Sequence, residues 1–278
     1  MKRQHQERRH PVTLRERVHG ALVGLAIGES RAGSTAGATA GATAGASATT
    51  RGSQGIASMA IALGESLLDF HGVDAVDIRR RADALDATLI NDERSALLRV
   101  GVVPLYYATD PRAAMRRAGE SSVATTASLR ASDACRYFAG LMIGALAGVP
   151  KDELLMPRYS PIPAFFEKEP LQADIDAVAG GSYRRAERPE VQETGPASQP
   201  LAGALWAFDG GDTFADGLAL ATSLGGSASA GALYGQLAGA WYGVHAIPGT
   251  WRMELDGRGL LEELADRLYK EGIEQASG

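Results

Sequence analysis

Apolar residues recur three or four positions apart along most of this chain, which is the spacing of one face of an α-helix. In the segment 53–68, for example, Met59, Leu63 and Leu67 follow this spacing and are predicted to be buried. The same spacing predicts helices over the segments 14–30, 69–93, 214–224, 224–243 and 260–268, and two more within 113–148. We therefore expect an all-α fold, formed as a single compact multi-helix domain by residues 14–272.

Two of these predicted helices carry small residues on one face. Small side chains leave that face nearly bare, so another helix can pack against it at short range. They are Ala232, Gly235, Gly239 and Gly243 in the segment 224–243, and Gly20, Gly24 and Gly28 in the segment 14–30. We expect the helix over 224–243 to lie at the centre of the bundle.

Two segments are predicted to lie outside the packed core. Residues 31–52 consist almost entirely of Gly, Ala, Ser and Thr, so they are interpreted as a flexible loop, with a disordered connector favoured over a functional lid. Residues 1–13 form a basic stretch that is interpreted as a solvated tail. No apolar run behind this tail is long enough for a signal peptide.

Composition narrows the range of partners and compartments. The 278 residues carry a formal net charge of −5, which offers no electrostatic case for nucleic acid binding. No apolar run approaches the length of a membrane span. The single cysteine, Cys135, excludes an intramolecular disulfide and fits a reducing compartment, so a cytoplasmic location is expected. In its apolar helix, Cys135 is interpreted as a small buried hydrophobe rather than a nucleophile.

The glycine-rich stretch at 224–243 resembles the C-terminal metal motif of the bacterial ADP-ribosylglycohydrolases. In that family a Gly-(Gly/Asp)-Asp-x-Asp-Thr sequence precedes a Tyr-Gly-Gln-Leu-Ala-Gly-Ala helix, which this chain matches from Tyr234 to Ala240. The metal half is not matched: Gly226 precedes Ser227 and Ser229, which stand at the two aspartate positions.

The first metal motif of the family is also replaced. Residues from Ser58 onward resemble its Ser-Met-Ala-x-x-Leu-x-Glu-Ser-Leu-Leu sequence, and this alignment places Gln54, Gly55, Ile56 and Ala57 over Thr-Asp-Asp-Thr. The segments 30–64 and 217–253 contain no Asp or Glu at all. Because Mg²⁺ prefers oxygen ligands with carboxylates among them, neither place offers the anionic ligands of a dinuclear magnesium site.

Further positions of the family pattern that do not belong to its packing residues are also replaced. Glu29 takes the place of an aspartate, Thr126 replaces a histidine, Arg94–Ser95 replaces an Asn-Gly pair and Ala202 replaces a glutamate. The packing residues are retained, among them Gly24, Met59, Trp206, Tyr234 and Trp251. The resemblance therefore implies that the fold is kept while the magnesium site is lost, and no metal or other cofactor is expected.

The resemblance also implies a ligand pocket, and three functions follow from it. By family-equivalent position the pocket residues are Glu29, Gln54, Gly55, Ile56, Thr126, Gly226, Ser227 and Ser229. The first hypothesis is a non-hydrolytic protein that binds an ADP-ribose- or nucleotide-like ligand or a protein partner. The second is a metal-independent enzyme acting on a nucleotide-derived substrate, with Glu29 as the only candidate acid. The third is a structural partner subunit.

Two further side chains leave alternatives open. Ser227 and Ser229, at the start of a predicted helix, could bind a phosphate through neutral donors and the helix dipole, and the other interpretation is a plain N-cap. Asp133 is interpreted as a helix-start or ion-pairing carboxylate rather than a catalytic base.

Overall fold

The computed structural model describes residues 11–39, 55–185, 187–192, 194–225 and 227–274, with the side chains of 33–39, 89 and 227 left out of the description. Within these ranges the chain forms helices and turns and no β-strand, so the all-α prediction is confirmed. The α-helices are α1 (Leu14–Thr39), α2 (Ile56–Asp69), α3 (Ala75–Leu85), α4 (Glu93–Arg99), α5 (Val102–Tyr106), α6 (Pro111–Val123), α7 (Leu129–Leu146), α8 (Lys151–Leu154), α9 (Phe165–Lys168), α10 (Ala173–Ala179), α11 (Ser198–Gly210), α12 (Phe214–Ser223), α13 (Ser227–Tyr242), α14 (Gly249–Met253) and α15 (Arg258–Glu274). Short 3-10 turns are η2 (Ala87–Leu89), η3 (Ser182–Arg184) and η4 (Val244–Ala246).

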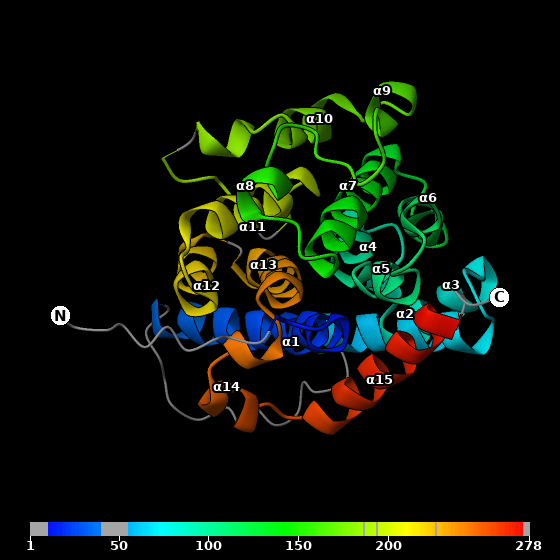
Figure 1. Ribbon diagram of the computed structural model, residues 1–278, viewed down its shortest axis with the longest axis horizontal. Helices are drawn as coiled ribbons and strands as arrows, with labels where there is room; N and C mark the ends of the chain where they lie inside the picture. The colour runs from blue at the N-terminus through cyan, green and yellow to red at the C-terminus, as the bar shows by residue number, and fades with distance from the viewer. Residues whose placement is uncertain (1–10, 40–54, 186, 193, 226, 275–278) are drawn as a thin grey trace.

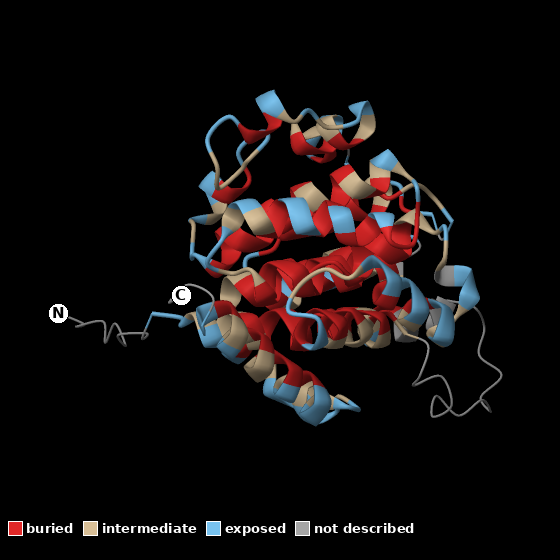
Figure 2. Cartoon of the chain, turned by 90° about the vertical axis from the view of Figure 1, so that its right-hand side faces the viewer, coloured by how far each residue is buried: buried red, intermediate tan, exposed pale blue. Residues whose placement is uncertain are grey.

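The centre of the fold is the pair formed by α1 and α13, which lie side by side in Figure 1. α7, α11 and α12 pack against α13 on the side away from α1, while α14 and α15 pack against α1 from the opposite side. Figure 2 shows the result: buried residues fill the middle of the molecule, and exposed residues lie on the outer helices. No helix in the described ranges combines the length and apolar character needed to cross a membrane.

Glycines bring the backbones of α1 and α13 into direct contact. A β-carbon at Gly239 would lie 1.9 Å from the carbonyl oxygen of Gly20, and one at Gly235 would lie 1.9 Å from that of Gly24. One at Gly28 would lie 2.0 Å from the carbonyl oxygen of Gly231. Since residue numbers rise along one helix as they fall along the other, the two helices are antiparallel. The predicted close helix contact at Gly235 and Gly239 is confirmed.

The contact face of α13 differs in detail from the prediction. Gly231 makes the third backbone contact, whereas the sequence pattern had assigned Ala232 to this face. Gly243 lies just beyond α13 with a φ of 80°, where it ends the helix rather than extending the face. The three contacting glycines of α13 are four residues apart, as are Gly20, Gly24 and Gly28 on α1, so a row at i±4 spacing on one helix packs against the same row on the other.

Helix α1 is longer than the sequence predicted. The prediction ended it at Ser30 and placed a flexible loop over 31–52, but the helix continues to Thr39, so the loop prediction is wrong for residues 31–39. Ala is the strongest helix former, and Ala32 is fully buried beside Gly231, so packing on α13 supports the extension. The rest of the predicted loop, 40–52, lies outside the described residues.

The start of α1 is fixed by a reciprocal cap. The hydroxyl of Thr13 accepts from the backbone N–H of Glu16 at 3.2 Å, and the Glu16 carboxylate accepts from the backbone N–H of Thr13 at 2.7 Å. These bonds hold the pKa of Glu16 below its ordinary value. The predicted basic tail, 1–13, therefore ends in an ordered turn, and its residues 1–10 lie outside the described ranges.

The backbone contact between α1 and α13 predicts opposite effects for one substitution at two sites. In Gly239→Ala the methyl group would meet the carbonyl of Gly20, and overpacking of this kind costs about 1–3 kcal/mol or more. The matched control is Gly259→Ala in α15, where an added β-carbon meets nothing within 4 Å. The control is expected to gain up to about 1 kcal/mol, because Ala is the better helix former.

Thermal melts of the two variants beside the parent protein measure the difference. Gly239→Ala should melt below the parent protein and Gly259→Ala at or above it. Equal melting temperatures for both variants would show that α1 and α13 do not touch as described.

Candidate functional site

The carboxylate of Glu29, on α1, lies at the N-terminus of α2. Its Oε1 accepts a hydrogen bond from the backbone N–H of Ile56 at 2.6 Å, and its Oε2 accepts one from that of Ala57 at 3.0 Å. The N-cap residue of α2, Gly55, provides no side-chain bond of its own. Glu29 therefore satisfies two N–H groups that the helix leaves without an internal partner, and its negative charge faces the positive end of the helix dipole.

Gly55 is the residue that permits this approach. A β-carbon at Gly55 would lie 2.5 Å from Oε1 of Glu29, so any larger residue would push the carboxylate away. The structure thus brings Glu29, Gly55 and Ile56 together. Both carboxylate oxygens of Glu29, the only candidate acid, are used to cap α2.

A second group of side chains gathers at the N-terminus of α13. The guanidinium of Arg94, on α4, donates through Nη2 to the hydroxyl of Ser229. It also donates through Nη1 to the backbone carbonyl of Gln192 at 2.9 Å. Arg94 is 8% exposed and Ser229 is 6% exposed, so this contact is largely shielded from solvent. A permanent positive charge therefore lies on one of the two residues that align with the family's metal-binding aspartates.

The position of Arg94 follows from the start of α4. Asp92 is the N-cap of this helix, and its carboxylate accepts from the backbone N–H groups of Arg94 at 3.2 Å and Ser95 at 3.0 Å. The hydroxyl of Ser95 donates to the same carboxylate. Because the cap fixes the first turn, Arg94 is directed from the beginning of α4 toward α13.

Thr126 lies in the connection between α6 and α7, which is held on α4. It is 5% exposed, and its hydroxyl accepts from the backbone N–H of Ser128 at 3.4 Å. Two neighbouring contacts hold the connection: the N–H of Asn91 donates to the carbonyl of Thr125 at 2.7 Å, and the hydroxyl of Ser128 donates to Glu93. Thr126 and Arg94 are thus supported by the same short helix, but among the described residues no hydrogen bond joins Thr126 to Glu29 or Ser229.

The two groups are connected through the pair of central helices. Gly28 precedes Glu29 and touches Gly231, which lies two residues after Ser229. The remaining predicted pocket positions are only partly described: Gln54 and Gly226 lie outside the described residues, and Ser227 is described as the first residue of α13 without its side chain.

The donor set at these positions does not fit a pair of magnesium ions. In the described ranges, no group of three or more His, Cys, Asp or Glu side chains lies close enough to hold a metal ion. The carboxylate of Glu29 is directed at backbone N–H groups, and the Ser229 hydroxyl is neutral and bonded to a guanidinium. Mg²⁺ requires oxygen ligands with negative charge among them, and a neighbouring cation opposes its binding.

Cys135 and Asp133 have the structural roles that the sequence favoured for them, a buried apolar side chain and an ion-pairing carboxylate. Cys135 is fully buried, and burial raises the pKa of its thiol to about 12, so it stays neutral at physiological pH. Asp133 accepts from Arg136 at 2.7 Å and from the backbone N–H of Gln172 at 2.7 Å, which makes it an ion-pairing carboxylate.

Arg94 is the site residue that sequence reasoning missed. The alignment registered it only as half of a lost Asn-Gly pair. The signal that could have identified it is the coincidence of two changes, the gain of a cation at position 94 and the loss of both aspartates at positions 227 and 229. A gain of positive charge on one side of a contact, together with a loss of negative charge on the other, points to a direct interaction.

The capping role of Glu29 predicts a stability effect. Glu29→Ala removes both bonds to the start of α2, and loss of a helix cap typically costs about 0.5–2 kcal/mol. Glu29→Gln keeps one acceptor oxygen and should lose less. Glu167→Ala, an exposed glutamate in α9, is the matched control and should change stability little. Urea unfolding of the three variants would contradict the capping role if Glu29→Ala matched the parent protein.

Comparisons with known proteins agree with one another. Two curated relatives, both named ADP-ribosylarginine hydrolase Tri1, come from Serratia proteamaculans (strain 568) and Pseudomonas putida (strain GB-1). The first is 28% identical over 149 residues, or 53% of this chain, and the second is 32% identical over 151 residues, or 54% of this chain. The matched region spans only 38% of the length of each relative.

A solved structure and a family model cover far more of the chain. The structure, described as an ADP-ribosylglycohydrolase-related protein complex, is 31% identical and superimposes with a TM-score of 0.74, covering 93% of this chain and 99% of that one. The family model described as ADP-ribosylglycohydrolase matches residues 10–278. Because this match includes nearly every residue, the chain belongs to the ADP-ribosylglycohydrolase family.

Proposed function

We propose that this chain binds an ADP-ribosyl or nucleotide-like ligand and does not hydrolyse it with a magnesium pair. The observation that carries the proposal is the guanidinium of Arg94 on the hydroxyl of Ser229. In the family this chain belongs to, that position is aspartate and faces metal ions. Here the protein supplies its own positive charge, and the carboxylate is gone.

The charge of Arg94 opposes a divalent cation at this place. Two unit charges 4 Å apart interact by about 4 kcal/mol at an effective dielectric constant of 20, and a dication would double the repulsion. A guanidinium is protonated at every accessible pH, so this repulsion cannot be removed by titration. Ser229 offers a hydroxyl oxygen that already accepts from that guanidinium.

The same charge favours an anionic ligand. Arginine is suited to phosphate groups because of its planar array of donors, and the adjacent start of α13 adds the positive end of a helix dipole. A diphosphate is the anionic part of an ADP-ribosyl group. We therefore assign Arg94 the role of attracting and orienting the phosphates, with Ser229 holding its guanidinium in place.

The hypothesis of a metal-independent enzyme is supported less well. It depends on Glu29 as the acid, and both oxygens of that carboxylate accept bonds from the first N–H groups of α2. Both carboxylate oxygens are thus used to cap α2, which leaves this side chain poorly placed to act on a substrate.

A protein-interaction subunit is the second candidate function. The similar solved structure, 31% identical, is described as a protein complex, and it matches this chain over nearly its whole length. If the present chain works in the same way, a partner protein rather than a small ligand is its main contact.

The proposal predicts binding without metal. Isothermal titration with ADP-ribose in the presence of a chelator should give a saturable signal, and subsequent Mg²⁺ should not change the affinity. Arg94→Gln should weaken binding about tenfold or more, because a bond to a charged group is worth about 1.5–3 kcal/mol. The control Arg117→Gln removes an exposed arginine that is paired with Glu120 on α6, and it should bind as the parent protein does.

Two results would contradict the proposal. Mg²⁺-dependent release of ADP-ribose from an ADP-ribosylated arginine substrate would show that hydrolysis is retained. The absence of any ADP-ribose binding signal would reject the small-molecule ligand and leave the interaction subunit as the remaining candidate.

A further inference from the structure

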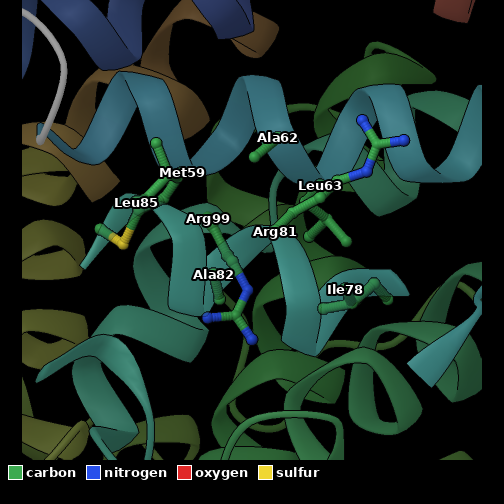
Figure 3. A pocket seen from close by; sticks show the side chains of 8 residues that line it. All are labelled: Met59, Ala62, Leu63, Ile78, Arg81, Ala82, Leu85 and Arg99. Carbon is green, nitrogen blue, oxygen red and sulfur yellow. The ribbon is translucent and has the colours of Figure 1, made fainter. Parts of the chain in front are cut away.

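A small cavity lies between α2, α3 and the end of α4, and its lining includes none of the residues of the proposed ligand site. Figure 3 shows the side chains that line it: Met59, Ala62 and Leu63 from α2, Ile78, Arg81, Ala82 and Leu85 from α3, and Arg99 from α4. Its volume is about 10 Å³, which is room for a single particle of about the size of a water molecule. Apart from two arginines, its wall is entirely apolar.

The guanidinium of Arg99 enters this cavity with unused donors. In Figure 3 it reaches into the space beside Ala82, and its residue is only 3% exposed. Nη2 donates to the hydroxyl of Thr125 at 2.6 Å and to the carbonyl of Ser121 at 3.4 Å. Nε and Nη1 are buried, and no described protein atom accepts from either of them. Buried donors without an acceptor are rare and costly, so these two require an explanation.

The charge of Arg99 is also not balanced by a direct ion pair. Burial lowers its pKa to about 10, so the side chain remains protonated at neutral pH. The two groups whose charges act on it are Cys135 and Asp92. Burial raises the pKa of the Cys135 thiol to about 12, which keeps it neutral, and the Asp92 carboxylate caps α4.

Arg81, the other cation of the wall, does not relieve the imbalance. It is turned away toward Asp69, at 2.6 Å, and Asp77, which between them neutralise it. Asp77 is shared with Arg80 as well. The carboxylates near the cavity are therefore already engaged on its outer side, and Arg99 remains the one wall residue in the described ranges with a buried charge and no carboxylate partner.

We propose that this cavity is a binding site for a monatomic anion, chloride in ordinary solution, which accepts from Nε or Nη1 of Arg99. A halide fits because it needs only donors and brings a compensating negative charge. A water molecule would accept from Arg99, but its own two O–H groups would face the apolar side chains of Met59, Leu63 and Ile78. Chloride is somewhat larger than a water molecule, so side chains of the wall such as Met59 and Leu85 must shift slightly to admit it, and a phosphate or carboxylate would need a larger displacement.

The bound anion would stabilise the support of the ligand site without touching a ligand. Arg99 is the last residue of α4, and its bond to Thr125 holds the connection that carries Thr126. An anion here fixes the end of the helix whose first turn carries Arg94. This inference does not rest on the proposed function, and either can fail without the other.

Crystals of the full chain grown in sodium bromide test the site directly. Bromide scatters anomalously and water does not. We expect an anomalous peak at hydrogen-bond distance from the Arg99 guanidinium. A well-ordered water at that place without anomalous signal, or a cavity closed by its side chains, would overturn the proposal.

Thermal melting gives an independent measurement in solution. At fixed ionic strength, replacing sodium gluconate by sodium chloride should raise the melting temperature of the parent protein saturably, by about 2–4 °C at high occupancy. Arg99→Met should lose this dependence. Arg81→Met, the matched control on the same cavity wall, should keep it. Persistence of the chloride effect in Arg99→Met would contradict the assignment, and if that variant does not fold, the bromide peak alone decides.

Discussion

The direct backbone contact between α1 and α13 is the constraint on which the rest of this structure depends. Glycines on both helices leave no side chain at three contact points along their seam, so the backbone of α13 at Gly235 lies directly against the carbonyl of Gly24. This contact sets the register of the two helices to within one residue, since a shift would bring larger side chains into the seam. It thereby fixes where Glu29 and Ser229 stand, on neighbouring turns at the same end of the pair.

At that end of the pair, the charged side chains of Glu29 and Arg94 are each held by hydrogen bonds within the protein. Where the resemblance implies metal-binding carboxylates, the structure places the guanidinium of Arg94 on Ser229. It directs the carboxylate of Glu29 to backbone N–H groups. Both charged side chains have hydrogen-bond partners: Glu29 caps α2, and Arg94 donates to the hydroxyl of Ser229 and the carbonyl of Gln192. The described side chains at this end are thus satisfied by hydrogen bonds within the protein, and this supports our proposal of ligand binding without the family's metal chemistry.

Much of the fold could be predicted from the sequence, and less of the site. Helical spacing identified most of the long helices, and the glycine stripes identified the closely packing faces of two of them, because both signals are local and repeat along the chain. That these two faces pack on each other came from the structure. The continuation of α1 to Thr39 was missed, since its Gly, Ala and Thr residues carry no periodic apolar pattern and gain their order from packing on α13. The contacts Glu29–Ile56 and Arg94–Ser229 were missed because they join residues 27 and 135 positions apart, which no local pattern encodes.

The most direct measurement of the central claim is a crystal structure of the chain grown with ADP-ribose and Mn²⁺, with anomalous data collected for manganese. The account predicts that Arg94 stays bonded to Ser229 and that no manganese peak appears between Glu29 and the start of α13. Two manganese peaks there, with the guanidinium of Arg94 displaced from Ser229, would show that this chain still assembles the family's metal site.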